Sequence, residues 1–234
     1  MNRSNIYGDL LFESIRIVGI EPQYLALHYK RLMHGMRVLK FDFRKFDFEI
    51  FEKEVCEAVK NHRTNYPQSS EILRLRFVVY RNANGFYLPD SHKIEYITEV
   101  FPFEPKVTEK PLRIGVFEEQ TKSPGPLSNI KSGNSLIYVM ASIWAREKEL
   151  DDALILNSKG NIIEASSSNI FWRINRQWFT PPLSDGCVEG IMREVFMGQN
   201  KVIEKSCSMS ELNKADEILL SNAIQGLRKF EIAN

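Results

Sequence analysis

The chain has 234 residues, with 31 Lys and Arg against 30 Asp and Glu, and its formal net charge is +1. Hydrophobic residues make up 43% and charged residues 26%, which is ordinary for a globular protein and excludes a largely disordered chain. The near-neutral charge, without a long basic block, argues against nucleic acid as a partner.

No apolar run approaches the roughly 18 residues of a membrane span, so no membrane partner is expected. The first four residues, Met1 to Ser4, lack the apolar core of a signal peptide. We therefore expect a cytoplasmic protein that acts on a small-molecule substrate.

The first half predicts a mixture of strands and helices. Segments rich in apolar and β-branched residues predict strands at 10–17, 24–27, 72–80, 86–87 and 94–100. Apolar residues at helical spacing predict helices at about 28–39 and 51–59. A strong turn signal at Asn82 to Gly85 separates the later strands.

Residues 101–111 carry three prolines and four charges, which favour an extended connection. We predict a smaller N-terminal α/β domain at 1–104, a linker at 105–111 and a larger C-terminal domain at 112–234. In this second half, strands are expected at 112–117, 152–157, 170–174 and 218–220, with helices at about 132–150 and after Glu189, and a hairpin turn at Lys159-Gly160.

Cysteines and histidines predict no metal site. Cys56, Cys187 and Cys207 are odd in number, widely spaced and free of the Cys-x-x-Cys pattern, so we expect inert buried thiols. The four histidines form no ligand cluster in the sequence: His28, His34, His62 and His92.

Two polar residues in apolar surroundings suggest a cofactor site: Lys131 in the segment 127–134 and Glu164 in the segment 161–172. A lysine amine can hold an aldehyde cofactor as a Schiff base, and a buried carboxylate can keep a pyridine nitrogen protonated. That is pyridoxal phosphate chemistry. From the residues alone, simpler interpretations stay open: Lys131 as a surface lysine at a helix start, and Glu164 as an exposed glutamate beside a turn.

A nucleotide site is a poorer interpretation of the segment 125–132. A phosphate-binding P-loop needs glycine immediately before the lysine, and here that residue is Ile130. Pro126 removes one further amide donor. A Gly-x-Ser-x-Gly nucleophile motif is also absent from the sequence.

Five segments in the same order resemble the fold-type-IV pyridoxal phosphate enzymes, the class-IV aminotransferase family. They are Tyr7 to Arg16, His28 to Leu32, Leu127 to Asn134, Asn161 to Trp172, and Thr180 to Arg193. The resemblance implies a two-domain fold of mixed α+β and α/β character with pyridoxal 5'-phosphate as cofactor. The family usually has one further strand before Tyr7, so the edge of the first sheet is expected to be covered differently here.

The resemblance implies a role for each matching residue. Lys131 would carry the cofactor and act as the general base, and Glu164 would pair with the pyridine nitrogen. Arg31 would bind the phosphate together with the start of a helix. The remaining cofactor-binding residues implied are Ser167, Gly190, Ile191, Met192, Ser221 and Asn222.

Within the family, the spacing is closest to 4-amino-4-deoxychorismate lyases. Asn134 follows Lys131 by three places, and Ser221-Asn222-Ala223 replaces the Gly-Thr-Ala typical of branched-chain aminotransferases. We therefore expect a lyase that forms 4-aminobenzoate and pyruvate for folate synthesis. The alternative is an aminotransferase acting on branched-chain or D-amino acids with 2-oxoglutarate; a catalytically silent relative is a third interpretation.

Two features stay open from the sequence. Candidate partners for a substrate carboxylate are Arg76, Arg81 and Arg228, each of which could equally be a surface arginine. A homodimer is implied by the resemblance alone.

Overall fold

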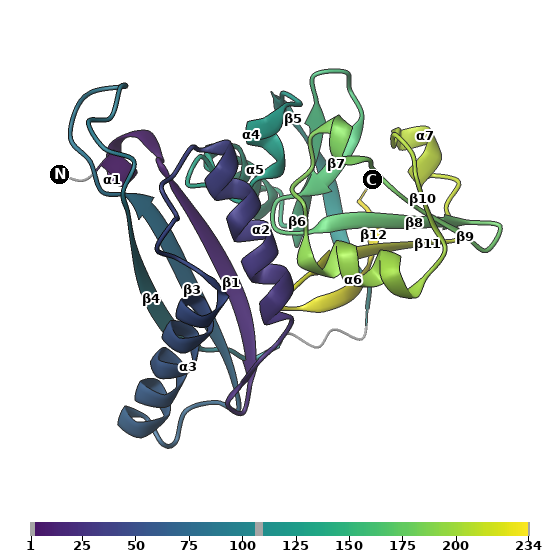
Figure 1. The fold of residues 1–234 in the computed structure, drawn as a ribbon. Helices are drawn as coiled ribbons and strands as arrows, with labels where there is room; N and C mark the ends of the chain where they lie inside the picture. The colour runs from purple at the N-terminus through teal and green to yellow at the C-terminus, as the bar shows by residue number, and fades with distance from the viewer. Residues whose placement is uncertain (1–2, 106–109, 234) are drawn as a thin grey trace. The chain divides into compact units, whose positions relative to one another are not determined.

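The computed structural model describes residues 3–105 and 110–233. The chain divides into two compact units (Figure 1): unit 1 comprises Met1–Pro105 and Ile130–Asn134, and unit 2 comprises Lys106–Asn129 and Ser135–Asn234. The linker predicted at 105–111 falls mostly outside the described residues. Ile130–Asn134 belongs to unit 1 although it lies far along the second half of the sequence.

Unit 1 is built on a four-stranded antiparallel sheet in the order β2-β1-β3-β4. Its strands are β1 (Leu10–Val18), β2 (Glu21–Pro22), β3 (Ile72–Arg81) and β4 (Ile94–Pro102), and its helices are α1 (Arg3–Tyr7), α2 (Leu25–Val38) and α3 (Phe48–Asn65). α2 packs on β1, and α3 packs on β3 and β4, so both long helices cover the same face of the sheet (Figure 1).

The covered face of this sheet carries the core of unit 1. Burial alternates strictly along β3, because successive side chains of a strand point to opposite faces. Phe77 of β3 is fully buried against Phe51 of α3, with their ring centres 4.8 Å apart. Asp47 stabilises the start of α3 by accepting a hydrogen bond from the Ile50 N–H at 2.9 Å.

Residues 24–27, predicted as a strand, instead begin α2. Tyr24 has a φ of 55° and precedes the first helical residue, Leu25. Leu25, Leu32 and Met36 are all buried on this helix. The helix therefore begins about one turn before residue 28, where the apolar spacing predicted its start.

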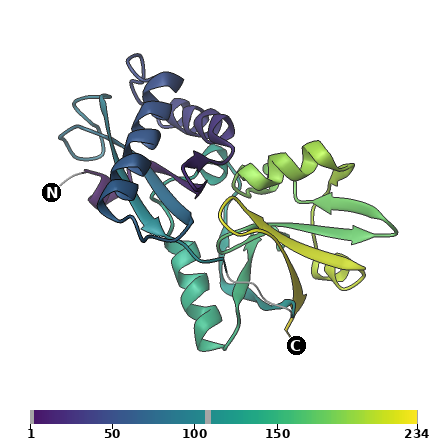
Figure 2. The same ribbon diagram turned by 90° about the horizontal axis from the view of Figure 1, so that it is seen from below.

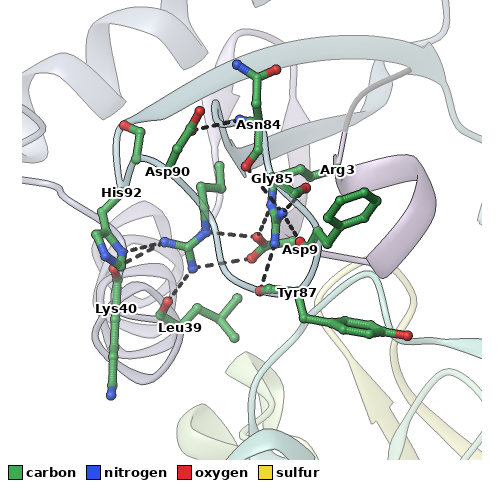
Figure 3. A network of polar contacts seen from close by, with 12 residues as sticks. Arg3, Asp9, Leu39, Lys40, Asn84, Gly85, Tyr87, Asp90 and His92 are labelled. Atoms are coloured by element: carbon green, nitrogen blue, oxygen red, sulfur yellow. Dashed lines mark hydrogen bonds and ion pairs between the residues drawn. The ribbon is translucent and has the colours of Figure 1, made fainter.

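Phe86 and Tyr87, predicted as part of a returning strand, lie in an exposed loop between β3 and β4. The guanidinium of Arg3 donates to the main-chain carbonyl of Gly85 at 2.8 Å and also to those of Phe86 and Tyr87 (Figure 3). These carbonyls are therefore bound by one side chain instead of a neighbouring strand.

Unit 2 contains an eight-stranded mixed sheet in the order β10-β9-β8-β11-β12-β5-β6-β7. Its strands are β5 (Leu112–Lys122), β6 (Asp152–Asn157), β7 (Ile162–Ala165), β8 (Asn169–Ile174), β9 (Gln177–Thr180), β10 (Val202–Glu204), β11 (Glu217–Asn222) and β12 (Gly226–Ile232). A bridge between Ile162 and Cys207, which follows β10, brings the two ends of the sheet together. The sheet thus curls around an apolar core that includes Trp172 and Leu220.

Unit 2 also contains five helices among its described residues. They are α4 (Pro126–Asn129), α5 (Leu136–Glu147), the 3-10 helix η1 (Leu183–Asp185), α6 (Ile191–Gln199) and α7 (Met209–Leu212). α5 packs on β5 and β6, and α6 packs on β11 (Figure 2). α5 begins four residues later than predicted, whereas the turn at Lys159-Gly160 joins β6 to β7 as predicted.

Two of the three cysteines are buried as expected, but Cys56 is exposed on α3, so the expectation of a buried thiol is wrong there. Burial, together with the negative charge of Glu164, raises the pKa of Cys187 to about 12. Across residues 3–105 and 110–233, no cluster of three or more His, Cys, Asp or Glu side chains is arranged to hold a metal ion. No helix in that described part is long and apolar enough to cross a membrane.

The packing of Phe77 makes a prediction about stability. Phe77→Ala should lower the free energy of unfolding by about 3–5 kcal/mol, because it removes a fully buried ring and leaves a cavity. Phe86→Ala is the matched control, since Phe86 is 83% exposed and its loss should change stability by no more than about 0.5 kcal/mol. Urea unfolding measures both; equal losses would contradict this account of the core.

Candidate active site

Lys131 lies on a short extended segment that pairs with the edge of β1. The Phe12 N–H donates to the Lys131 carbonyl at 3.0 Å, and Leu11 faces Ser132 in an antiparallel bridge. Lys131 is therefore directly opposite Phe12, and opposed side chains in such a pair project from the same face. Lys131 Nζ lies 4.3 Å from the centre of the Phe12 ring.

The residues that flank Lys131 fix this pairing. The Gly133 N–H donates to the Leu10 carbonyl at 3.0 Å, and a Cβ at position 133 would lie 2.8 Å from Leu10 Cγ, so a larger residue there would displace the Leu10 side chain. Ile130 is buried in the core of unit 1. Sheet pairing therefore holds Lys131, which excludes the interpretation of a surface lysine at the start of a helix.

Arg31 is buried on α2 and is bound by a carboxylate that the sequence did not single out. Arg31 Nε donates to Glu13 Oε1 at 2.8 Å, and Arg31 Nη2 donates to Glu13 Oε2, which makes the pair bidentate. His28 Nδ1 lies 2.6 Å from Glu13 Oε2. Glu13 thus fixes the orientation of the predicted phosphate arginine.

The protonation states in this cluster follow from its contacts. Burial raises the pKa of Glu13, but the charge and hydrogen bonds of Arg31, helped by His28, outweigh it and lower that pKa to about 2. Burial lowers the pKa of His28; the hydrogen bond and charge of Glu13 oppose this, whereas the positive charges of Arg31 and Lys131 add to it, and the pKa lies below its usual value. His28 is therefore neutral and donates its Nδ1–H to the Glu13 carboxylate, while its buried Nε2 has no hydrogen-bond partner in the described structure.

Glu164 is buried at the end of β7, with 3% of its surface exposed, which excludes the interpretation of an exposed glutamate. Its Oε1 accepts hydrogen bonds from Lys122 Nζ at 2.7 Å and from the Tyr138 hydroxyl at 2.8 Å. Its Oε2 accepts from the Val188 N–H at 2.9 Å. The carboxylate is therefore fixed by donors from three separate segments of unit 2.

Gly190 lies immediately before α6, where a side chain would not fit. A Cβ there would lie 1.8 Å from Asn169 Oδ1, and Asn169 Nδ2 donates to the Val188 carbonyl at 2.9 Å. α6 begins at Ile191, followed by Met192, with no side-chain cap over its first turn. The first amides of a helix have no partner within the helix, and their dipoles favour an anion.

Three further predicted residues gather beside this helix start. Ser221 of β11 is paired in register with Asn169 of β8, and its Oγ is buried without a hydrogen-bond partner among the described residues. Asn222 Nδ2 donates to the Ser167 carbonyl at 3.3 Å and to Ser168 Oγ at 3.0 Å. Unit 2 therefore brings the predicted cofactor-binding residues Glu164, Ser167, Gly190, Ser221 and Asn222 into one neighbourhood.

Of the three candidate arginines, Arg81 already binds groups of its own unit, among them Asp9, Leu39 and His92, which Figure 3 labels. Its Nε donates to Asp9 Oδ2 at 2.8 Å, its Nη2 to the Leu39 carbonyl at 2.6 Å, and its Nη1 to His92 Nδ1 at 2.7 Å. These contacts hold the loop after β3 to the end of α2. Arg81 therefore has a structural role, and it is a poor candidate for binding a substrate.

Arg76 lies on the same sheet face as Lys131. In the register of β1 and β3, Arg76 is opposite Ser14 and Arg74 is opposite Arg16. Ser14 and Arg16 follow Phe12 by two and four residues, so all of these side chains project from the face that carries Lys131. Arg228 lies instead on β12 of unit 2, where burial lowers its pKa.

The structure adds Glu13, Lys122, Tyr138 and Arg74 to the residues found from the sequence. Glu13 had a signal, because it interrupts the inward-facing apolar positions of β1, where a charge must be paired. Lys122 and Tyr138 had none, since they lie 42 and 26 residues from Glu164. Only the fold brings these side chains together.

The chain matches the model of the amino-transferase class IV family over residues 10–231. It belongs to this family. The family consists of pyridoxal phosphate-dependent enzymes that act on small molecules, so the predicted enzyme class and the predicted fold-type-IV architecture are confirmed. Sequence identity to aminodeoxychorismate lyase of Vibrio harveyi is 27% over 236 residues, covering 97% of this chain and 83% of that protein.

Solved structures of both activities share the fold. The branched-chain aminotransferase of Thermoproteus uzoniensis, solved with norvaline, has a TM-score of 0.83 at 25% identity, covering 99% of this chain and 80% of that one. The 4-amino-4-deoxychorismate lyase of Pseudomonas aeruginosa has a TM-score of 0.83 at 21% identity, covering 99% and 85%. The fold therefore does not separate the two activities.

The Glu13 cluster makes a prediction about stability and pH. The pKa of Glu13 falls from 4.5 in the unfolded chain to about 2 in the folded one, so unfolding takes up a proton in this range. The stabilisation is complete above pH 4.5 and is lost as the pH falls toward 2; for a group this deeply buried it amounts to roughly 3 kcal/mol.

The effect is measured by urea unfolding of wild type and Glu13→Gln from about pH 6 down to about pH 2.5. Wild type should lose stability more steeply than Glu13→Gln. The matched control is Glu57→Gln, at an exposed position on α3, which should keep the wild-type slope. The same slope in all three proteins would contradict the role given to Glu13.

Proposed function

We propose that this protein is a pyridoxal phosphate-dependent 4-amino-4-deoxychorismate lyase, which forms 4-aminobenzoate and pyruvate for folate synthesis. The observation that carries the proposal is the presence of Arg74 and Arg76 on the sheet face that also carries Lys131. Arg74 suits a substrate carboxylate, and Arg76, whose Nη1 lies 3.4 Å from Glu99 Oε2, suits a second one where that carboxylate replaces the exposed glutamate.

Lys131 holds the cofactor through its amine, and the bound cofactor supplies an electron-accepting ring. With the substrate bound to the cofactor, the Lys131 amine would take the proton from the substrate carbon that carries the nitrogen. The C–O bond at the neighbouring carbon would break, which leaves an aromatic ring, and the released enolpyruvate would take up a proton to become pyruvate. The sheet pairing with β1 fixes the backbone of Lys131.

The residues of unit 2 fit the phosphate and the ring of this cofactor. The buried Ser221 Oγ lacks a partner, and a phosphate oxygen would supply one. The uncapped start of α6 at Gly190, Ile191 and Met192 offers amide donors to an anion. In this proposal Arg31 also binds the phosphate, Ser167 and Asn222 also contact the cofactor, and Glu164 is the partner of the ring nitrogen.

The environment of Arg74 supports an anionic substrate. Arg74 Nε is buried without a hydrogen-bond partner within residues 3–105 and 110–233, and its Nη2 reaches only Ser14 Oγ, at 3.3 Å. Burial and the neighbouring charge of Arg76 lower the pKa of Arg74.

Branched-chain substrates fit this face less well. A branched-chain amino acid has one carboxylate and an apolar side chain, which would remove water from the second guanidinium without replacing its hydrogen bonds. Aminodeoxychorismate has two carboxylates. The aminotransferase alternative nevertheless keeps support from the relatives of that activity, and 2-oxoglutarate is also a dicarboxylate.

One assay separates the two activities. Purified protein loaded with pyridoxal phosphate is given aminodeoxychorismate, and pyruvate release is followed with lactate dehydrogenase. A parallel reaction supplies leucine, valine or D-alanine with 2-oxoglutarate, and glutamate is measured. Pyruvate release at the higher rate supports the lyase, whereas glutamate formation without pyruvate release from aminodeoxychorismate would replace it with the aminotransferase.

Lys131 should carry the cofactor. Borohydride reduction of the loaded protein, followed by digestion and mass spectrometry, should place the pyridoxyl adduct on the peptide that contains Lys131. Lys131→Ala should abolish both the adduct and turnover, because the covalent anchor and the base are lost together. An adduct on Lys122 or Lys159 would contradict the assignment.

Arg74→Met should raise the KM for aminodeoxychorismate by roughly ten- to a hundredfold, with a smaller change in kcat. The reason is the loss of one charge-assisted hydrogen bond, about 1.5–3 kcal/mol. Arg44→Met is the matched control, because Arg44 is exposed and paired with Asp42 away from this sheet face. An unchanged KM in Arg74→Met would exclude this arginine from substrate binding.

We also propose that the enzyme works as a cytoplasmic homodimer, which its resemblance to the family implies. Sedimentation equilibrium of the loaded protein tests the assembly. A mass of one chain at micromolar concentration would argue against it.

A further inference from the structure

Lys122 and Tyr138 have no role in the function proposed above, yet both touch Glu164. Lys122 Nζ donates to Glu164 Oε1 at 2.7 Å, to the Tyr138 hydroxyl at 2.5 Å and to the Ser128 carbonyl at 2.8 Å. An ammonium has three donors, so all of those of Lys122 are used. Lys122 comes from the end of β5 and Tyr138 from the first turn of α5.

The side chains of Lys122, Tyr138 and Glu164 are all hydrogen-bonded to one another, with Lys122 donating to both of the others and Tyr138 donating to Glu164. Because the Tyr138 oxygen accepts from Lys122, its own proton is directed to Glu164 Oε1 at 2.8 Å. Burial and the charge of Glu164 raise the pKa of Tyr138, so its hydroxyl keeps that proton. The Lys122 ammonium donates all three of its protons to hydrogen bonds, which makes it a poor nucleophile for an aldehyde.

Counting acceptor positions shows what Glu164 has left. An ionised carboxylate offers about four lone-pair positions, two on each oxygen. Lys122 and Tyr138 fill both positions on Oε1, and the Val188 N–H fills one on Oε2. A single acceptor position remains, on Oε2, in the same neighbourhood of unit 2 as Ser221 and Gly190.

We propose that Lys122 and Tyr138 are positioning residues that keep Glu164 ionised and leave only its Oε2 to accept the N–H of the cofactor's pyridine ring. The inference rests on the proposed function, because it needs pyridoxal phosphate as the ligand. It deepens that function by identifying the groups that control one proton. This proton can lie either on the ring nitrogen of the cofactor or on Glu164.

The charge of Lys122 decides between these two positions. With Lys122 present, the carboxylate anion is stabilised by a cation at 2.7 Å, and the proton stays on the ring nitrogen. Without Lys122, a buried anion facing a buried pyridinium is less stable than the neutral pair of carboxylic acid and pyridine. The proton should then move to Glu164, and the ring becomes a weaker electron acceptor.

The experiment uses full-length protein loaded with pyridoxal phosphate that carries nitrogen-15 in its ring, whose chemical shift distinguishes pyridinium from pyridine. Wild type and Lys122→Arg should give the pyridinium signal at neutral pH, because both keep the cation. Lys122→Met should give the neutral pyridine signal. Lys205→Met is the matched control, since Lys205 pairs with Glu211 at a more exposed position of unit 2, and it should behave as wild type.

A second variant protects the test if Lys122→Met does not fold. Tyr138→Phe keeps the ion pair but removes one donor to Oε1, so the ring nitrogen should lose its proton at a lower pH than in wild type. A wild-type titration in both Lys122→Met and Tyr138→Phe would overturn the inference, as would a wild-type titration in Tyr138→Phe where Lys122→Met is unfolded. If wild type itself gives no bound ring signal, the cofactor assignment fails instead, so the two failures are distinguishable.

Discussion

The pairing of Ile130–Asn134 with the edge of β1 is the constraint on which the candidate site of unit 1 depends. Side chains alternate along an extended segment, so Ile130 and Lys131 must point to opposite faces. Burial of Ile130 in the core therefore fixes Lys131 on the other face, beside Phe12. A slip of one residue would bury the lysine and expose the isoleucine, so packing and chemistry select the same register.

Each unit also contains a buried carboxylate that organises the groups around it. In unit 1, Glu13 orients Arg31 and accepts a hydrogen bond from His28. In unit 2, Lys122 and Tyr138 orient Glu164. A buried ion pair adds little stability compared with well-packed apolar residues of the same volume, although neutralising one partner of an existing pair is destabilising. In this protein the two ion pairs fix the orientation of side chains. Glu13 fixes the plane of the Arg31 guanidinium, and Lys122 occupies one oxygen of Glu164, which leaves the other to accept a further hydrogen bond.

The sequence predicted most of the fold because the apolar patterns of its long strands and helices are regular. It failed where local chemistry overrode the pattern: Tyr24 adopts a left-handed conformation that starts α2 early, and Arg3 binds the carbonyls of Phe86 and Tyr87. Motif resemblance led to the predicted site residues, since each lies in a recognisable segment. Lys122 and Arg74 lie in no motif, and their importance comes from partners that only the strand register and the tertiary fold identify.

Arg74 and Arg76 bear on the choice between the two activities. An aminotransferase site receives an amino acid and a keto acid in turn, so with a branched-chain substrate it must accept an apolar side chain in one half-reaction and a dicarboxylate in the other. The single carboxylate of a branched-chain amino acid could not serve both Arg74 and Arg76, and Arg74 Nε is buried without a hydrogen-bond partner among the described residues. A lyase acting on aminodeoxychorismate meets a carboxylate-bearing ligand at every stage, and a fixed pair of arginines carries no such cost. The arrangement of charge on this sheet face is therefore more consistent with a lyase than with a branched-chain aminotransferase.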